Sequence, residues 1–240
     1  MTLPSYIGVG TYAVTAVNAS IAPSFHASTA AGDLCLLICE TNGSTVPNPD
    51  SSVWTECPGS PHTSSGGSLP TRITAFWRVA VGGMSAPSVS RNSGNHVMGV
   101  IATFRGADPT TPFPVSSVYN SGANNGTWRT PGLTTLTADN MYIGICNTGR
   151  DQRAASGTWY LGTGSNASLA NYAKRFDEGE DDGDGGSICI VTGEKAAAGV
   201  VSDTTGALGN NNGCVIGLGL ALAPGAGGGS TSRSFAVMAG

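Results

Sequence analysis

Short apolar segments alternate with clusters of Gly, Pro, Asn and Ser along most of the 240-residue chain, and a helical period of apolar positions is nearly absent. Such segments, bounded by turn-forming residues, are typical of β-strands. Ala167–Phe176 is the one stretch compatible with a short helix, and we predict a strand there as well. The pattern predicts an all-β fold whose clearest strands are Tyr6–Val14, Asp33–Glu40, Arg72–Val81, His96–Arg105, Asn140–Asn147, Ser187–Glu194 and Cys214–Ala223.

Two of these segments show how the strands are buried. Arg72–Val79 places Ile73, Ala75 and Trp77 on one face, which indicates a strand with that face towards a core. Leu34–Cys39 is apolar on both faces. That pattern predicts a central strand covered on both sides.

The two halves of the chain resemble each other weakly. Two pairs of segments correspond at similar spacing: Ala31–Thr41 with Ala138–Thr148, and Ile73–Ala107 with Ile188–Pro224. Trp54 follows the first segment and Trp159 follows its counterpart, and Val97–Ile101 falls near Cys214–Leu218. The alternative is chance similarity between β-strands.

If the repeat is genuine, neither half offers enough strands to bury its own face. We therefore predict that residues 1–224 form one jelly-roll-like antiparallel β-sandwich of about eight to ten strands, in which the two halves face each other. Residues 225–240 read as a Gly/Ser-rich linker with an apolar tip that contains Phe235, Val237 and Met238. We expect this arm to insert into a neighbouring subunit; the alternative is a disordered end.

Charged residues make up only 11% of the chain, against about 25% in an ordinary soluble domain. The surface is therefore built largely from Ser, Thr, Asn and Gly, which favours permanent packing into an assembly; a secreted adhesin is the alternative. The net charge of −4 and the scattered basic residues argue against nucleic acid. We find no membrane-spanning run of apolar residues and no signal peptide, so we expect synthesis in a cytosol.

Five of the six cysteines lie in apolar segments, where a free thiol behaves as a small buried hydrophobe. Cys57 lies between Glu56 and Pro58 in a predicted loop, and we expect it to be the one exposed thiol or an intersubunit disulfide. The spacing of cysteines and histidines does not match a zinc site.

No arrangement of residues indicates catalysis. His26, His62 and His96 lie outside any nucleophile motif, and we interpret His96 as a half-buried histidine beside Met98. We therefore predict that the chain is not an enzyme and needs no cofactor.

Six carboxylates fall within residues 177–184, and the spacing of Glu180, Asp182 and Asp184 is superficially that of a calcium loop. The segment lacks the rest of that motif, so a solvated acidic hairpin tip is the preferred interpretation. Trp128 lies in a predicted loop, where an exposed ring offers a stacking platform for a glycan.

Several motifs together resemble the virion structural β-sandwich proteins of tailed bacteriophages. The resemblance covers residues 3–120 well and the remainder loosely, and it is carried by Gly32–Leu34 with its apolar strand, Trp54, Arg72–Ala80, Ala86–Ser90 and Ile101–Phe113. It implies a structural role on the head or tail of the particle and carries over no catalytic residues.

We therefore expect a virion protein, made in the host cytoplasm, that decorates or cements the capsid through non-covalent contacts with other virion proteins, the major capsid protein above all. We expect a homo-oligomer, and specifically a trimer. The first alternative is a tail-fibre or tail-tip module that binds a host-surface glycan, and the second is an extracellular glycan-processing enzyme.

Overall fold

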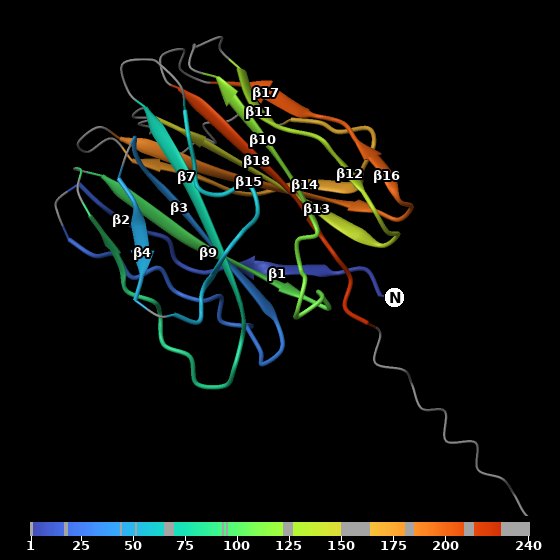
Figure 1. The fold of residues 1–240 in the computed structure, drawn as a ribbon, viewed down its shortest axis with the longest axis horizontal. Coiled ribbons are helices and arrows are strands. Elements are labelled where there is room, and N and C mark those ends of the chain that lie inside the picture. The colour runs from blue at the N-terminus through green and yellow to red at the C-terminus, as the bar shows by residue number, and fades with distance from the viewer. Residues whose placement is uncertain are drawn as a thin grey trace, which may run out of the picture.

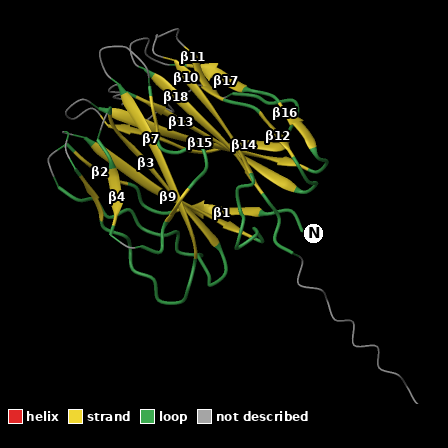
Figure 2. Ribbon diagram, viewed as in Figure 1, coloured by secondary structure: helices red, strands yellow, loops and turns green. Residues whose placement is uncertain are grey.

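The computed structural model describes residues 2–16, 19–43, 45–50, 52–64, 70–92, 94, 96–121, 127–149, 164–180, 185–208 and 214–226. In these ranges the chain forms strands, turns and loops and no helix, as Figure 2 shows by colour. The predicted all-β fold is confirmed. No helix within the described ranges is long and apolar enough to cross a membrane.

The first half of the chain builds a seven-stranded antiparallel sheet (Figure 1). Its main path runs, in spatial order, through β1 (Ser5–Val9), β9 (Val97–Arg105), β3 (Leu34–Asn42), β7 (Thr71–Val79) and β5 (Thr55–Glu56). Two short strands complete it: β2 (Ala13–Thr15) beside β9, and β6 (His62–Thr63) beside β7.

The second half builds a five-stranded antiparallel sheet. Its order is β10 (Val115–Ser121), β18 (Val215–Leu222), β13 (Asn140–Thr148), β15 (Gly186–Lys195) and β14 (Ala170–Glu180). The strand predicted over Ala167–Phe176 is therefore present as β14, displaced by a few residues. The other predicted strands are also present, and the first of them is divided into β1 and β2.

The two halves share one strand order. In each sheet the central strand, β3 or β13, lies between the last strand of its half, β9 or β18, and a long later strand, β7 or β15. The turn before each central strand contains a positive φ, 88° at Gly32 and 58° at Asp139. The weak sequence repeat therefore corresponds to a repeat of topology.

The pairing corrects the sequence alignment by one residue in the last strand of each half. Gly99 pairs with Cys39, and Gly217 pairs with Cys146, so these two glycines are equivalent. The alignment of Val97–Ile101 with Cys214–Leu218 set Gly99 against Ile216. A slip of one residue matters because it exchanges the two faces of a strand.

The two sheets pack face to face over one apolar interior (Figure 1). The inward positions of β3 and β9 meet those of β13, β15 and β18, and all are buried. Representative residues are Leu36, Val100, Ile143, Ile190 and Leu218. Jelly-roll connectivity is not confirmed, since each large sheet is built by one half of the chain.

The outer face of each sheet is covered as well. A ribbon of β4 (Pro47–Pro49) and β8 (Val89–Arg91), with Ile21, lies over the first sheet and buries Cys35, Leu37 and Ile101. Over the second sheet lie two ribbons, which pair β11 (Thr127–Thr130) with β17 (Thr204–Ala207) and β12 (Leu133–Thr135) with β16 (Gly199–Val201). This covering explains why the central strands are apolar on both faces.

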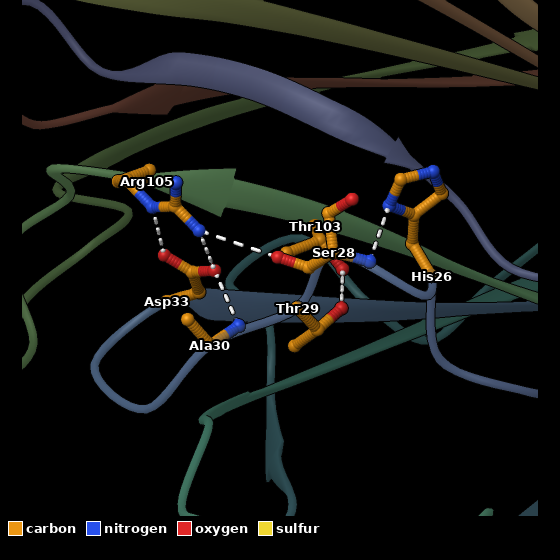
Figure 3. A network of polar contacts seen from close by, with 7 residues as sticks. All are labelled: His26, Ser28, Thr29, Ala30, Asp33, Thr103 and Arg105. Carbon is orange, nitrogen blue, oxygen red and sulfur yellow. Dashed lines mark hydrogen bonds and ion pairs between the residues drawn. The ribbon is translucent and has the colours of Figure 1, made fainter.

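A polar network ties the loop before β3 to the end of β9 (Figure 3). The Arg105 guanidinium donates to both carboxylate oxygens of Asp33, each at 2.8 Å, and the Ala30 amide donates to the same carboxylate. Burial alone would raise the pKa of Asp33, but these bonds and the charge of Arg105 hold it below its usual value. Asn140, the equivalent residue in the second half, bonds within its own loop to Thr137.

Candidate functional site

One edge of the first sheet is formed by two short strands, β5 and β6, which both pair with β7. Thr55 pairs with Trp77 of β7, and Glu56 pairs with Phe76. Because neighbouring residues of a strand point to opposite faces, Phe76 packs towards the outer cluster and Trp77 towards the interior. The edge therefore carries an aromatic ring on each side, and each ring lines a hollow.

The outer hollow has a volume of about 370 Å³. Trp54, which is 8% exposed, lies parallel to Phe25 with the ring centres 6.4 Å apart, and the Arg78 guanidinium is 5.6 Å from the Trp54 ring. The indole Nε1 of Trp54 has no hydrogen-bond partner in the described part of the chain. The residues that line this hollow are Asn48, Pro49, Asp50, Ser52, Trp54 and Phe76.

The inner hollow, on the other side of β5, has a volume of about 470 Å³. The Ser60 hydroxyl accepts a bond from the Ala75 amide at 2.8 Å and donates to Glu56 at 3.3 Å, so the carboxylate is held at the rim. Burial raises the pKa of Glu56, while Ser60 and the charge of Arg72 oppose that shift. The hollow is completed by Trp77, Cys57, Pro58 and the segment Thr110, Thr111, Pro112 and Phe113.

The predicted exposed thiol is not found at this site. Cys57 is 2% exposed and belongs to the shared interior, because its amide bonds to the Ala75 carbonyl and draws the loop inward. Burial raises the pKa of Cys57 well above its usual value, so the thiol stays protonated and is a poor nucleophile. All six cysteines are free and buried.

The corresponding position in the second half is filled by the protein itself. Thr192 of β15 pairs with Ile143 as Trp77 of β7 pairs with Leu36. Arg175 of β14 donates to the Thr192 hydroxyl at 2.8 Å, and its guanidinium lies 4.7 Å from the Tyr6 ring of β1. Among the described residues, the repeat therefore has a buried Thr192 bonded to Arg175 where the first sheet has a half-buried Trp77 beside a hollow.

A second notable site is a buried ion pair between the sheets. His96 Nε2 lies 2.8 Å from Glu40 Oε2, and both side chains are fully buried. The Thr71 hydroxyl donates to the other oxygen of Glu40 at 2.8 Å. From the second sheet, Gly186 approaches so closely that a Cβ there would lie 2.3 Å from Glu40 Oε2. The predicted half-buried histidine is thus fully buried and paired with an acid.

The surroundings of His96 act in opposite directions on its pKa. Burial lowers it, whereas the charge and hydrogen bond of Glu40 and the charge of Glu180 raise it against the smaller effect of Arg91. The net result is a raised pKa, so the fold favours the imidazolium form. This arrangement is a structural ion pair; it has no opening to solvent at either side chain.

The prediction that Trp128 is an exposed stacking residue is wrong. Trp128 is 0% exposed and belongs to β11, whose ribbon lies on the outer face of the second sheet. Gly206 faces it across the ribbon, and Gly164 lies against the indole ring. The ring therefore holds the ribbon on the sheet and offers no platform.

The remaining predicted residues lie partly outside the described ranges. Glu180 ends β14 and is 8% exposed, whereas Asp182 and Asp184 are not described. Within the described part of the chain no group of three or more His, Cys, Asp or Glu residues is placed to hold a metal ion. Phe235, Val237 and Met238 of the predicted arm, and Trp159, also lie outside those ranges.

Two large aliphatic side chains project from one ribbon over the second sheet. Leu136, just after β12, is 68% exposed, and Val200 of β16 is 65% exposed. Val201, the next residue, is buried against the sheet, so the ribbon alternates between packed and solvent-facing positions. Sequence reasoning missed this surface because Val200-Val201 reads as a uniformly apolar pair.

Comparison with known proteins gives no relative for this chain. No protein-family model matches it, no curated protein matches it, and no solved structure matches its fold.

Proposed function

We propose that the chain is a non-enzymatic structural subunit of a larger assembly, a bacteriophage particle, where it decorates or cements the capsid. The observation that carries the proposal is the pair Leu136 and Val200, exposed on one ribbon of a molecule whose other sheet faces are already covered. Thr134 pairs with Val200, and Leu136 lies two residues further along, so the two exposed side chains share one face of the ribbon. Neighbouring exposed apolar side chains favour docking more than a single one such as Val53 does.

The composition supports the same role. With 11% charged residues the surface has few like charges to keep copies or partners apart. Each contact that buries apolar area contributes about 25 cal/mol per Å² of buried surface, and a closed shell adds these contributions over many copies. The major capsid protein is the partner proposed, and a homotrimer is the proposed oligomer.

The test uses charge substitution at the exposed ribbon. Leu136→Asp and Val200→Asp are expected to reduce the copy number on purified particles at least about tenfold, because each places a charge in a docked apolar contact. Val53→Asp is the matched control, since Val53 is 51% exposed but lies in the first half, away from the ribbon. Full occupancy by the ribbon variants would contradict the proposal.

The arm is tested separately. Deleting residues 227–240 leaves the backbone bond from Gly225 to Gly106 in place, so the sandwich is expected to stay folded. Loss of the truncated chain from particles would support insertion of Phe235, Val237 and Met238 into a neighbour. Retention at full occupancy would remove the arm from the proposal.

A second candidate function is a tail-fibre or tail-tip module that binds a host-surface glycan. Trp128 is not available for it, because the ring is buried. The hollows beside β5 support this alternative, since they bring aromatic rings and carboxylates together at one edge of the first sheet.

A further inference from the structure

We propose that the β5 edge binds neutral sugars, with one sugar unit in each of the two hollows that lie on opposite sides of the strand. The proposal does not rest on the assembly role. It gives the glycan-binding alternative a site, and the variants that test it differ from those that test docking.

The hollows suit sugar units in size and in apolar surface. Volumes of about 370 and 470 Å³ lie at the lower end of the range of small-molecule sites, which is about 300–1,000 Å³. The aromatic surface offered to a ligand is that of Phe76 in the outer hollow and of Trp77 in the inner one, both half-buried, since Trp54 is 8% exposed and contacts Phe25 and Arg78. Because the C–H face of a sugar ring is apolar, it packs well against such aromatic surfaces.

The polar groups suit a ligand rich in hydroxyls. Asp50, Asn48 and Ser52 line the outer hollow. In the inner hollow Glu56 is already oriented by Ser60, and Asp108 fixes the neighbouring segment by accepting bonds from the amides of Thr110 and Thr111. A carboxylate can accept hydrogen bonds from more than one hydroxyl. Each hollow therefore has one group that can bind the hydroxyls of a sugar ring while the face of that ring packs on the aromatic side chain.

The charges of the lining point to a neutral sugar. Among the described residues that line the two hollows there are two carboxylates and no lysine or arginine. A phosphate- or carboxylate-bearing sugar would therefore meet a carboxylate in each hollow, and no basic side chain lines either hollow to contact its charge. The Arg78 guanidinium lies at the Trp54 ring and does not line the hollow.

The comparison of the two edges supports a site and not a packing defect. At the equivalent position of the second sheet Thr192 is fully buried, Arg175 donates to its hydroxyl, and the Arg175 guanidinium lies 4.7 Å from the Tyr6 ring. At the β5 edge the position of Thr192 is taken by Trp77, whose ring is half-buried and borders the open hollow. The two equivalent positions thus differ: the second sheet has a buried threonine bonded to an arginine, and the first has a half-buried aromatic ring that borders a hollow.

A proline-rich peptide is the competing ligand, because it also binds aromatic grooves. Such a peptide has few donors and needs few polar partners. The many hydroxyl, amide and carboxylate groups at this edge favour the oligosaccharide.

The test measures binding of di- to tetrasaccharides of neutral hexoses and N-acetylhexosamines to the full-length chain, by calorimetric titration and tryptophan fluorescence. Each chain is expected to bind two sugar units, one in each hollow. Glu56→Gln is expected to weaken binding in the inner hollow and Asp50→Asn binding in the outer hollow, each about tenfold, the loss expected of one charge-assisted hydrogen bond. Glu194→Gln is the matched control, since Glu194 lies on the second sheet and bonds to Asn171.

Three outcomes would overturn the proposal. The first is no binding of any oligosaccharide at millimolar concentration. The second is equal weakening, or none, in Glu56→Gln, Asp50→Asn and Glu194→Gln. The third is binding of a proline-rich peptide that depends on Glu56 and Asp50 while the sugars fail to bind.

Discussion

At the scale of single residues, the buried pair Glu40–His96 is the most demanding feature of the interior. Two ionisable side chains without solvent contact lose their hydration, and that loss is offset only if each charge keeps its partner. Glu40 also accepts a bond from Thr71, so its carboxylate is held from two sides. Removing either partner leaves an uncompensated polar group between the sheets.

The pair predicts a pH dependence of stability. The pKa of His96 is raised in the fold, so its imidazolium form adds to the free energy of unfolding. This stabilisation is fully present below the pKa of the unfolded chain, about 6.5, and is lost as pH rises through the pKa of the folded protein. We expect the free energy of unfolding in urea to fall over that window.

The control for this effect is His96→Gln, in which the fall is expected to disappear while overall stability drops. Asp33 does not affect this measurement, because its pKa is lowered in the fold. The stability that Asp33 contributes is lost only in acid, as pH falls through its pKa in the folded protein. An unchanged slope in His96→Gln would contradict the assignment.

Trp128 shows where residue-level reasoning from sequence reaches its limit. Its neighbours Asn124, Asn125 and Gly126 are turn-forming residues, so the sequence pattern indicates a loop. Burial came from tertiary packing: a four-residue ribbon strand lies on the second sheet and turns this ring inward. No local pattern of alternation is long enough to reveal such a strand.

At the scale of elements, glycines in β18 decide how closely the outer ribbons approach. A Cβ at Gly217 would lie 2.3 Å from the Arg129 carbonyl oxygen, and one at Gly219 would lie 2.5 Å from that of Pro131. Both contacts are with backbone, which cannot rotate away. The segment that joins β11 to β12 therefore rests directly on β18.

We expect Gly219→Ala to destabilise the protein by about 1–3 kcal/mol, the usual cost of overpacking, because the ribbon must shift. The matched control is Gly82→Ala, since a Cβ at Gly82 meets no atom within 4 Å. Denaturation midpoints of the two variants measure the difference. Equal midpoints would show that the ribbon is not fixed by this contact.

The long strands were predictable because their apolar patterns are long and bounded by turn residues. β3, β7, β9, β13, β15 and β18 all fall close to their predicted ranges. The short strands were not, because β5 has two residues and β4 contains two prolines. Since the candidate site is built around β5, it was missed although Trp77 was predicted to face a core.

At the scale of the whole molecule, the repeat explains why both halves are needed. Each half supplies one large sheet, and the inward faces of the two sheets form a single interior. Sequence similarity suggested this arrangement but misplaced one strand by a residue, because alternating strands align almost equally well in neighbouring registers. Only the packing of the two sheets shows which face of each strand lies towards the shared interior.

We expect residues 1–113 and 114–240, expressed separately, to lack cooperative unfolding, because each would expose its half of the shared interior to water. The full chain is expected to unfold in one transition by fluorescence and by circular dichroism. Two separate transitions, or a stably folded half, would show that the halves are independent domains.

The central claim about function is that the molecule works as a packed subunit of a virion. The most direct test is quantitative mass spectrometry of purified particles from a phage that encodes the chain. We expect to find the chain in fixed proportion to the major capsid protein after extensive washing. Its absence from mature particles, with the protein present only in the lysate, would contradict the account.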